Sequence, residues 1–128
     1  MVVHQNDYVK ITFDQNKKRL TQKWTGFASS DKFREAIDKT KDFVKKNDVK
    51  TILSDTLNQN VVKPEDSDYA ASTIPTMVNS GMKAMAFVVP ENVFTQLSLN
   101  KFSSSVKGDT TGYFKTLAEA EKWLDDKA

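Results

Sequence analysis

The order of apolar and polar positions predicts a chain in which strands alternate with helices. Residues 8–14 and 19–25 alternate between apolar and polar side chains, which is typical of two strands of a hairpin with one buried face. The adjacent Ile52 and Leu53, and the continuously apolar residues 84–89, indicate central strands that are covered on both faces. A short last strand is expected at residues 112–114.

Apolar residues at helical spacing predict four helices: after Ser29 or Ser30, over residues 66–80, over residues 92–101 and after Thr116. Thr116 and Glu119 form a capping box for the last of them. Pro75 is expected to kink the second helix or to end its first segment near Ile74. The order is β-β-α-β-α-β-α-β-α. We therefore expect one α/β domain over residues 1–128, with a five-stranded mixed sheet.

Composition limits the compartment and the partners. The chain contains no cysteine, which excludes disulfides and fits a reducing compartment. No apolar run is long enough to span a bilayer and no signal peptide is apparent, so we expect a cytoplasmic protein that is not an integral membrane protein. The net charge of +2, with arginine only at positions 19 and 34, weighs against nucleic-acid binding. Lys17, Lys18 and Arg19 are interpreted as a solvated hairpin tip.

The residues give little support for catalysis. His4 is the only histidine and lies in a terminus that is expected to fray. The four glycines form neither a P-loop nor a dinucleotide fingerprint, so no cofactor is expected. Asp55, Glu65 and Asp66 could hold a metal ion. Acidic residues in a first helical turn already stabilise the helix dipole, however, and we expect neither a metal site nor an enzyme.

A group of large apolar residues offers a different possibility. Trp24, Phe94, Leu97 and Phe102 could line a pocket for a hydrophobic ligand beneath the helix over residues 92–101. The competing interpretation is that these side chains are ordinary core, because a small domain needs most of its large apolar residues for packing. If the apolar face of that helix is exposed, it could instead cover a second copy in a homodimer.

Several strings, in this order, resemble the SpoIIAA-like group of bacterial proteins, over about residues 8–124. They are Trp24-Thr25-Gly26, Ile52-Leu53-Ser54-Asp55, Lys63-Pro64-Glu65-Asp66, Gly81 with Met85-Ala86-Phe87-Val88, and Glu119-Ala120-Glu121-Lys122-Trp123-Leu124. This group is related to STAS domains and, in fold, to CRAL-TRIO lipid-binding domains. The resemblance implies a sheet with helices mainly on one side.

The resemblance also implies a candidate site. Regulatory STAS domains open the helix after the third strand with an Asp-Ser-Ser-Gly motif, and a partner kinase phosphorylates its serine. The matching place here is Glu65-Asp66-Ser67-Asp68, in which Asp66 and Ser67 match while Asp68 and Tyr69 depart from the motif. Glu65, Asp66, Ser67 and Asp68 are thus the candidate partner-binding residues, with Ser67 as the phosphosite.

Two functional hypotheses follow. The first is a non-enzymatic, STAS-like domain that contacts an unidentified protein partner through the loop over residues 56–67. The alternative is a carrier or sensor of a small, lipid-like hydrophobic ligand in the manner of CRAL-TRIO domains. A large apolar cavity under residues 92–102 would favour the carrier, whereas a filled core would favour the interaction domain.

Overall fold

The computed structural model describes residues 1–60, 62–93 and 110–127, and in them six strands form one mixed sheet. The strands are β1 (Val2–Gln5), β2 (Val9–Asp14), β3 (Arg19–Gly26), β4 (Thr51–Gln59), β5 (Ala84–Val88) and β6 (Thr111–Phe114), and they lie in this order across the sheet. β1, β2 and β3 pair antiparallel, whereas β3 to β6 pair parallel. The mixed α/β architecture is confirmed, but the sheet has six strands and not the expected five.

The unpredicted strand is β1, in the terminus that was expected to fray. The backbone N–H of Phe13 donates to the Met1 carbonyl oxygen at 2.8 Å, and Val2 lies opposite Thr12 on β2. Val3 packs against the core. Four residues with no clear alternation give a weak local signal, and the strand exists because β2 offers it a partner.

β4 is also longer than expected, because residues 56–59 belong to the strand and not to the following loop. Their backbone pairs with the end of β3, where Thr25 lies opposite Asn58 and Gly26 opposite Gln59. The Asn60 N–H then donates to the Gly26 carbonyl oxygen at 2.9 Å. Pairing with a distant strand thus overrides a polar local sequence.

Three helices are described: α1 (Ser30–Lys46), α2 (Pro64–Asn79) and α5 (Leu117–Lys127). The predicted N-terminal caps of α1 and α5 are confirmed. The Ser29 Oγ accepts from the Lys32 N–H, and the Thr116 Oγ1 accepts from the Glu119 N–H. α2 runs through Pro75, so it does not end near Ile74. Of the helix expected over residues 92–101, residues 94–101 lie outside the described part, and residues 91–93 are helical.

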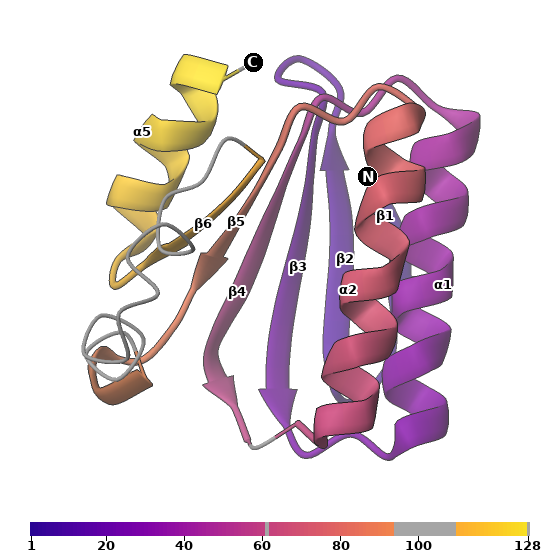
Figure 1. Ribbon diagram of the computed structural model, residues 1–128, viewed down its shortest axis with the longest axis vertical. Helices are drawn as coiled ribbons and strands as arrows, with labels where there is room; N and C mark the ends of the chain where they lie inside the picture. The colour runs from indigo at the N-terminus through magenta and orange to yellow at the C-terminus, as the bar shows by residue number, and fades with distance from the viewer. Residues whose placement is uncertain (61, 94–109, 128) are drawn as a thin grey trace.

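The helices cover opposite faces of the sheet (Figure 1). α1 and α2 lie side by side on one face, over a core that includes Ile11, Leu20 and Ile52. α5 packs on the other face against β4, β5 and β6, where Leu53 belongs to a second core cluster. The adjacent Ile52 and Leu53 therefore point to opposite faces, as their pattern predicted.

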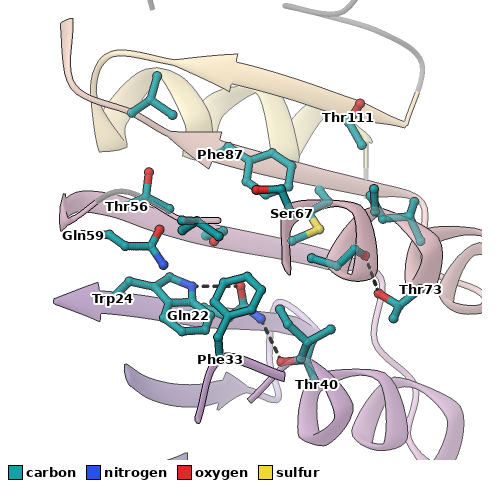
Figure 2. A pocket seen from close by; sticks show the side chains of 18 of the residues that line it. Gln22, Trp24, Phe33, Thr40, Thr56, Gln59, Ser67, Thr73, Phe87 and Thr111 are labelled. Carbon is teal, nitrogen blue, oxygen red and sulfur yellow. Dashed lines mark hydrogen bonds between the residues drawn. The ribbon is translucent and has the colours of Figure 1, made fainter. Parts of the chain in front are cut away.

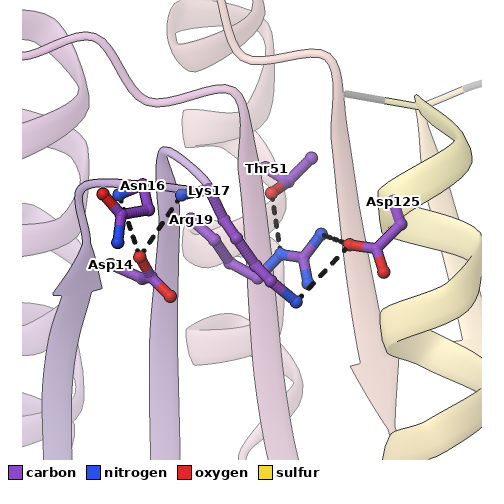
Figure 3. Close-up of polar contacts among 6 residues, drawn as sticks. All are labelled: Asp14, Asn16, Lys17, Arg19, Thr51 and Asp125. Atoms are coloured by element: carbon purple, nitrogen blue, oxygen red, sulfur yellow. Dashed lines mark hydrogen bonds and ion pairs between the residues drawn. The ribbon is translucent and has the colours of Figure 1, made fainter.

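Arg19, on β3, connects α5 to the sheet through side-chain hydrogen bonds (Figure 3). Its Nε donates to the Thr51 Oγ1 at 3.0 Å and its Nη2 to the Asp125 Oδ1 at 2.7 Å. Only 4% of Arg19 is exposed, so its assignment to a solvated hairpin tip is wrong. Lys17 and Lys18 do lie exposed at this turn. Among the described helices, none has the length and apolar character needed to cross a membrane.

Candidate ligand-binding pocket

A pocket of about 690 Å³ lies on the α1 and α2 face of the sheet. β3, β4, β5 and β6 form its floor, and α1 and α2 contribute one wall (Figure 2). The described lining residues are Gln22, Trp24, Phe33, Ile37, Thr40, Ser54, Thr56, Gln59, Val62, Ser67, Ala70, Ala71, Thr73, Ile74, Met77, Met85, Phe87, Val89, Val93, Thr111 and Tyr113. Most of these side chains are aliphatic or aromatic. The pocket therefore offers a largely apolar interior.

Two aromatic pairs stand on either side of this interior. The ring centroids of Trp24, on β3, and Phe33, on α1, lie 5.1 Å apart. The rings of Phe87 and Tyr113 are stacked at 5.1 Å on the neighbouring strands β5 and β6. Such ring contacts contribute about 0.5–1.5 kcal/mol per pair beyond burial and so stabilise the positions of these aromatic side chains.

A hydrogen-bonded amide occupies the buried side of the floor. The Gln22 Nε2 donates to the Thr40 Oγ1 at 2.8 Å, and the Gln22 Oε1 accepts from the Trp24 Nε1 at 3.3 Å (Figure 2). The Thr40 hydroxyl donates in turn to the Ala36 carbonyl oxygen at 3.0 Å. These bonds fix the Trp24 indole in the wall and provide partners for a glutamine that is 1% exposed.

The other polar side chains of the lining fall into two classes. The hydroxyls of Thr56 and Thr73 donate to main-chain carbonyl oxygens, those of Val88 and Ala70. A second class makes no side-chain hydrogen bond within the described residues: Ser54, Gln59, Ser67, Thr111 and Tyr113. Burial raises the pKa of the Tyr113 hydroxyl, which stays protonated at neutral pH and can donate. The pocket thus has unused hydrogen-bonding groups.

Charge is absent from the described lining, which contains no Asp, Glu, Lys, Arg or His. Ser67 and Ala71 are exposed and also line the pocket, so the pocket meets solvent beside the first turns of α2. The interior consequently suits an uncharged group, while a polar end can reach water near Ser67.

The four candidate partner-binding residues at the start of α2 do not share one environment. Glu65, Ser67 and Asp68 are exposed, whereas Asp66 is 3% exposed between α1 and α2. The Asp66 carboxylate accepts from the Ser30 Oγ at 2.7 Å and from the Arg34 Nε at 2.9 Å. Those two contacts, with the Ser30 hydrogen bond first, lower the pKa of Asp66. Asp66 therefore holds two helices together, and three residues remain free for a partner.

Of the predicted pocket residues, Trp24 lines the pocket. Phe94, Leu97 and Phe102 lie outside the described residues. Sequence reasoning missed Gln22 and Ser54, although a polar residue at the inward position of an otherwise apolar strand is a usable signal.

The carboxylates considered for a metal site are separated by the sheet. Ser54 faces the pocket, so the next residue, Asp55, faces the α5 side, away from Asp66. The Asp55 Oδ1 accepts from the Leu57 N–H at 3.1 Å. Within residues 1–60, 62–93 and 110–127, no three His, Asp or Glu side chains come together as metal ligands would.

Comparison with known proteins identifies the fold. No protein-family model and no curated protein matches the chain. A solved structure does: an uncharacterised protein of the DUF3478 family with a SpoIIAA-like fold, from Shewanella loihica PV-4, aligns with a TM-score of 0.60. The alignment covers 94% of this chain and 98% of that one at 12% identity. The chain therefore has a SpoIIAA-like fold, as its sequence resemblance implied.

Proposed function

We propose that the protein is a non-enzymatic carrier or sensor of a small hydrophobic ligand. The observation that carries this proposal is the cavity of about 690 Å³ with predominantly apolar walls. Ligand pockets in proteins commonly have volumes of about 300–1,000 Å³ and combine apolar walls with a few polar groups. A filled core at this place would instead have favoured a domain that acts through its surface alone.

The chemistry of the lining supports binding in preference to catalysis. Its described polar groups are hydroxyls and amides, and general acid–base catalysis at neutral pH usually employs a histidine, a carboxyl group or an amine. The absence of cysteine from the chain supports a reducing compartment, such as the cytoplasm, as the place where the protein acts.

Filling the pocket mouth tests this function. Ala71 is exposed on α2 and lines the pocket, so Ala71→Phe places a ring in the opening while changing stability by less than about 0.5 kcal/mol. We expect the neutral dye Nile red to bind the wild-type protein saturably, with increased emission, and the variant at least about tenfold more weakly.

Ala118→Phe is the matched control, because Ala118 is an exposed helical position on α5, which covers the opposite face of the sheet. It should bind Nile red as the wild-type protein does. Equal affinity of all three proteins, or no saturable binding by the wild-type protein, would contradict the proposed function.

A second candidate function is protein contact through Glu65, Ser67 and Asp68. Their exposure at the start of α2 favours it, and Ser67 belongs both to this surface and to the pocket lining. A ligand at the mouth could thereby alter the surface that a partner meets. Asp66 is excluded from this surface because it is buried and already paired with Ser30 and Arg34.

The second candidate is tested by proximity labelling with the full chain. The triple variant Glu65→Gln, Ser67→Ala and Asp68→Asn should lose labelling of a partner that the wild-type chain labels. Glu121→Gln, at an exposed position on α5, is the control and should retain it. Unchanged labelling by the triple variant would remove this surface from consideration.

A further inference from the structure

One row of side chains crosses the pocket floor at right angles to the strands. The strand register places Gln22 opposite Ser54, Ser54 opposite Phe87, and Phe87 opposite Tyr113. All four side chains line the pocket, so an amide and a hydroxyl lie beside a stacked aromatic pair. We propose that the pocket selects a neutral lipophile bearing a hydroxyl or carbonyl group, which hydrogen-bonds to Ser54. This inference rests on the proposed function and specifies its ligand class.

Two polar groups of this row, Ser54 and Tyr113, make no side-chain hydrogen bond within the described residues, and Ser54 is the more deeply buried of the two. It lies on β4, in the middle of the parallel part of the sheet, and is 2% exposed. Its hydroxyl makes no hydrogen bond within the described residues, while its neighbour Gln22 bonds to Thr40 and Trp24. A ligand that displaces water from Ser54 leaves this hydroxyl without a hydrogen bond unless the ligand supplies one, and that loss carries a free-energy cost. A ligand oxygen beside Ser54 would remove that cost, and an alkyl chain alone would not.

The neutrality of the ligand follows from the surroundings of Ser54. Among the described lining residues none carries a charge, so a carboxylate or ammonium at Ser54 would lose its hydration without gaining a counterion from these side chains. Arg34, on α1, does not supply one, because its Nε is bonded to Asp66 and its guanidinium lies 4.8 Å from the Tyr69 ring centroid. An alcohol or ketone loses much less hydration on entering and regains a hydrogen bond.

Three probes of twelve carbons each test the selectivity: dodecanol, dodecanoate and dodecylammonium, titrated calorimetrically below their aggregation limits at about pH 8, where the acid is ionised. We expect dodecanol to bind at least about tenfold more tightly than either ion. Ser54→Ala should weaken dodecanol by about 3–10-fold, the equivalent of one neutral hydrogen bond, and leave the ions unchanged. Ser72→Ala, an exposed position of α2 outside the pocket lining, is the control and should bind like wild type.

The outcomes separate this inference from the function beneath it. If dodecanoate or dodecylammonium binds as tightly as dodecanol or more tightly, the charged group of the probe remains in water at the pocket mouth. That result would overturn the proposed selectivity for neutral ligands, whereas the proposed function of binding a hydrophobic ligand would stand. Unchanged dodecanol affinity in folded Ser54→Ala would overturn the role of Ser54. Binding of none of the three probes would overturn the proposed function as well.

Discussion

Asp66 shows how one side chain can differ from its neighbours in the same helical turn. Glu65 and Asp68 are exposed, but Asp66 is buried between α1 and α2 and bonds to Ser30 and Arg34. The Tyr69 hydroxyl, which donates to Asp38, adds a second polar contact between these helices. Since α2 forms one wall of the pocket, these contacts help to hold the wall in position.

Replacing Asp66 should change how stability depends on pH. Because the pKa of Asp66 is lowered in the folded protein, its ionised form adds stability above its unfolded pKa of about 4. That stability is lost as the pH falls through the folded pKa. Asp66→Asn should therefore be less stable than wild type at about pH 7, and the difference should shrink below about pH 4.

Urea denaturation across this pH range measures the effect. Asp68→Asn, at an exposed position of the same turn, is the control and should follow the wild-type curve at every pH. A stability difference between wild type and Asp66→Asn that is the same at neutral and acid pH would show that the Asp66 carboxylate is not responsible.

Ser54 illustrates what sequence reasoning can find in a single residue. Its position inside an apolar strand was visible in the sequence, but its significance depends on Gln22, Phe87 and Tyr113. These residues come from three other strands, and their register is set by pairing across the whole sheet. A local pattern could not predict that these four side chains lie opposite one another across the pocket floor.

Among the elements, α5 is attached to the sheet by a charge as well as by its apolar face. Asp125 accepts from the buried Arg19 at 2.7 Å, and this hydrogen bond lowers the pKa of Asp125. The Arg19 Nη1 is buried without a hydrogen-bond partner within the described residues, so this guanidinium depends on Asp125 and Thr51.

Asp125→Asn should destabilise the protein by about 1–2 kcal/mol, because it weakens the contact of a buried cation. This loss is small for a hydrogen bond between charged groups, which usually contributes about 1.5–3 kcal/mol. The reason is that the Asp125 side chain is half exposed, so water can partly replace its carboxylate as a partner of Arg19. Chemical denaturation measures the loss. Asp126→Asn is the adjacent exposed control and should stay within about 0.5 kcal/mol of wild type. Equal denaturation midpoints for the two variants would contradict this role of Asp125.

The elements that sequence reasoning located well carry their signals locally. Ser29 caps α1, and Thr116 with Glu119 begins α5, each through bonds within one helical turn. β1 and the end of β4 were missed because their own residues give a weak strand signal, and each is a strand through its pairing with another strand, β2 or β3. The boundary errors therefore fall where tertiary pairing, and not propensity, decides the structure.

In the molecule as a whole, the SpoIIAA-like fold was predictable, whereas the pocket was not. The mixed sheet follows from the alternating and continuous apolar runs. The cavity depends on where α1 and α2 lie over strands β3 to β6, and no pattern of residues specifies that spacing. Trp24 was a predicted pocket residue, but the composition alone could not distinguish a pocket from a filled core.

Methionine methyl NMR tests the central claim most directly, because the chain contains four methionines in suitable places. Met77 and Met85 line the pocket, Met82 is buried outside its lining, and Met1 is exposed. On titration of methyl-labelled protein with dodecanol, we expect the resonances of Met77 and Met85 to shift saturably while those of Met1 and Met82 stay in place. Unmoved Met77 and Met85 signals, or equal shifts of all four, would contradict binding in this pocket.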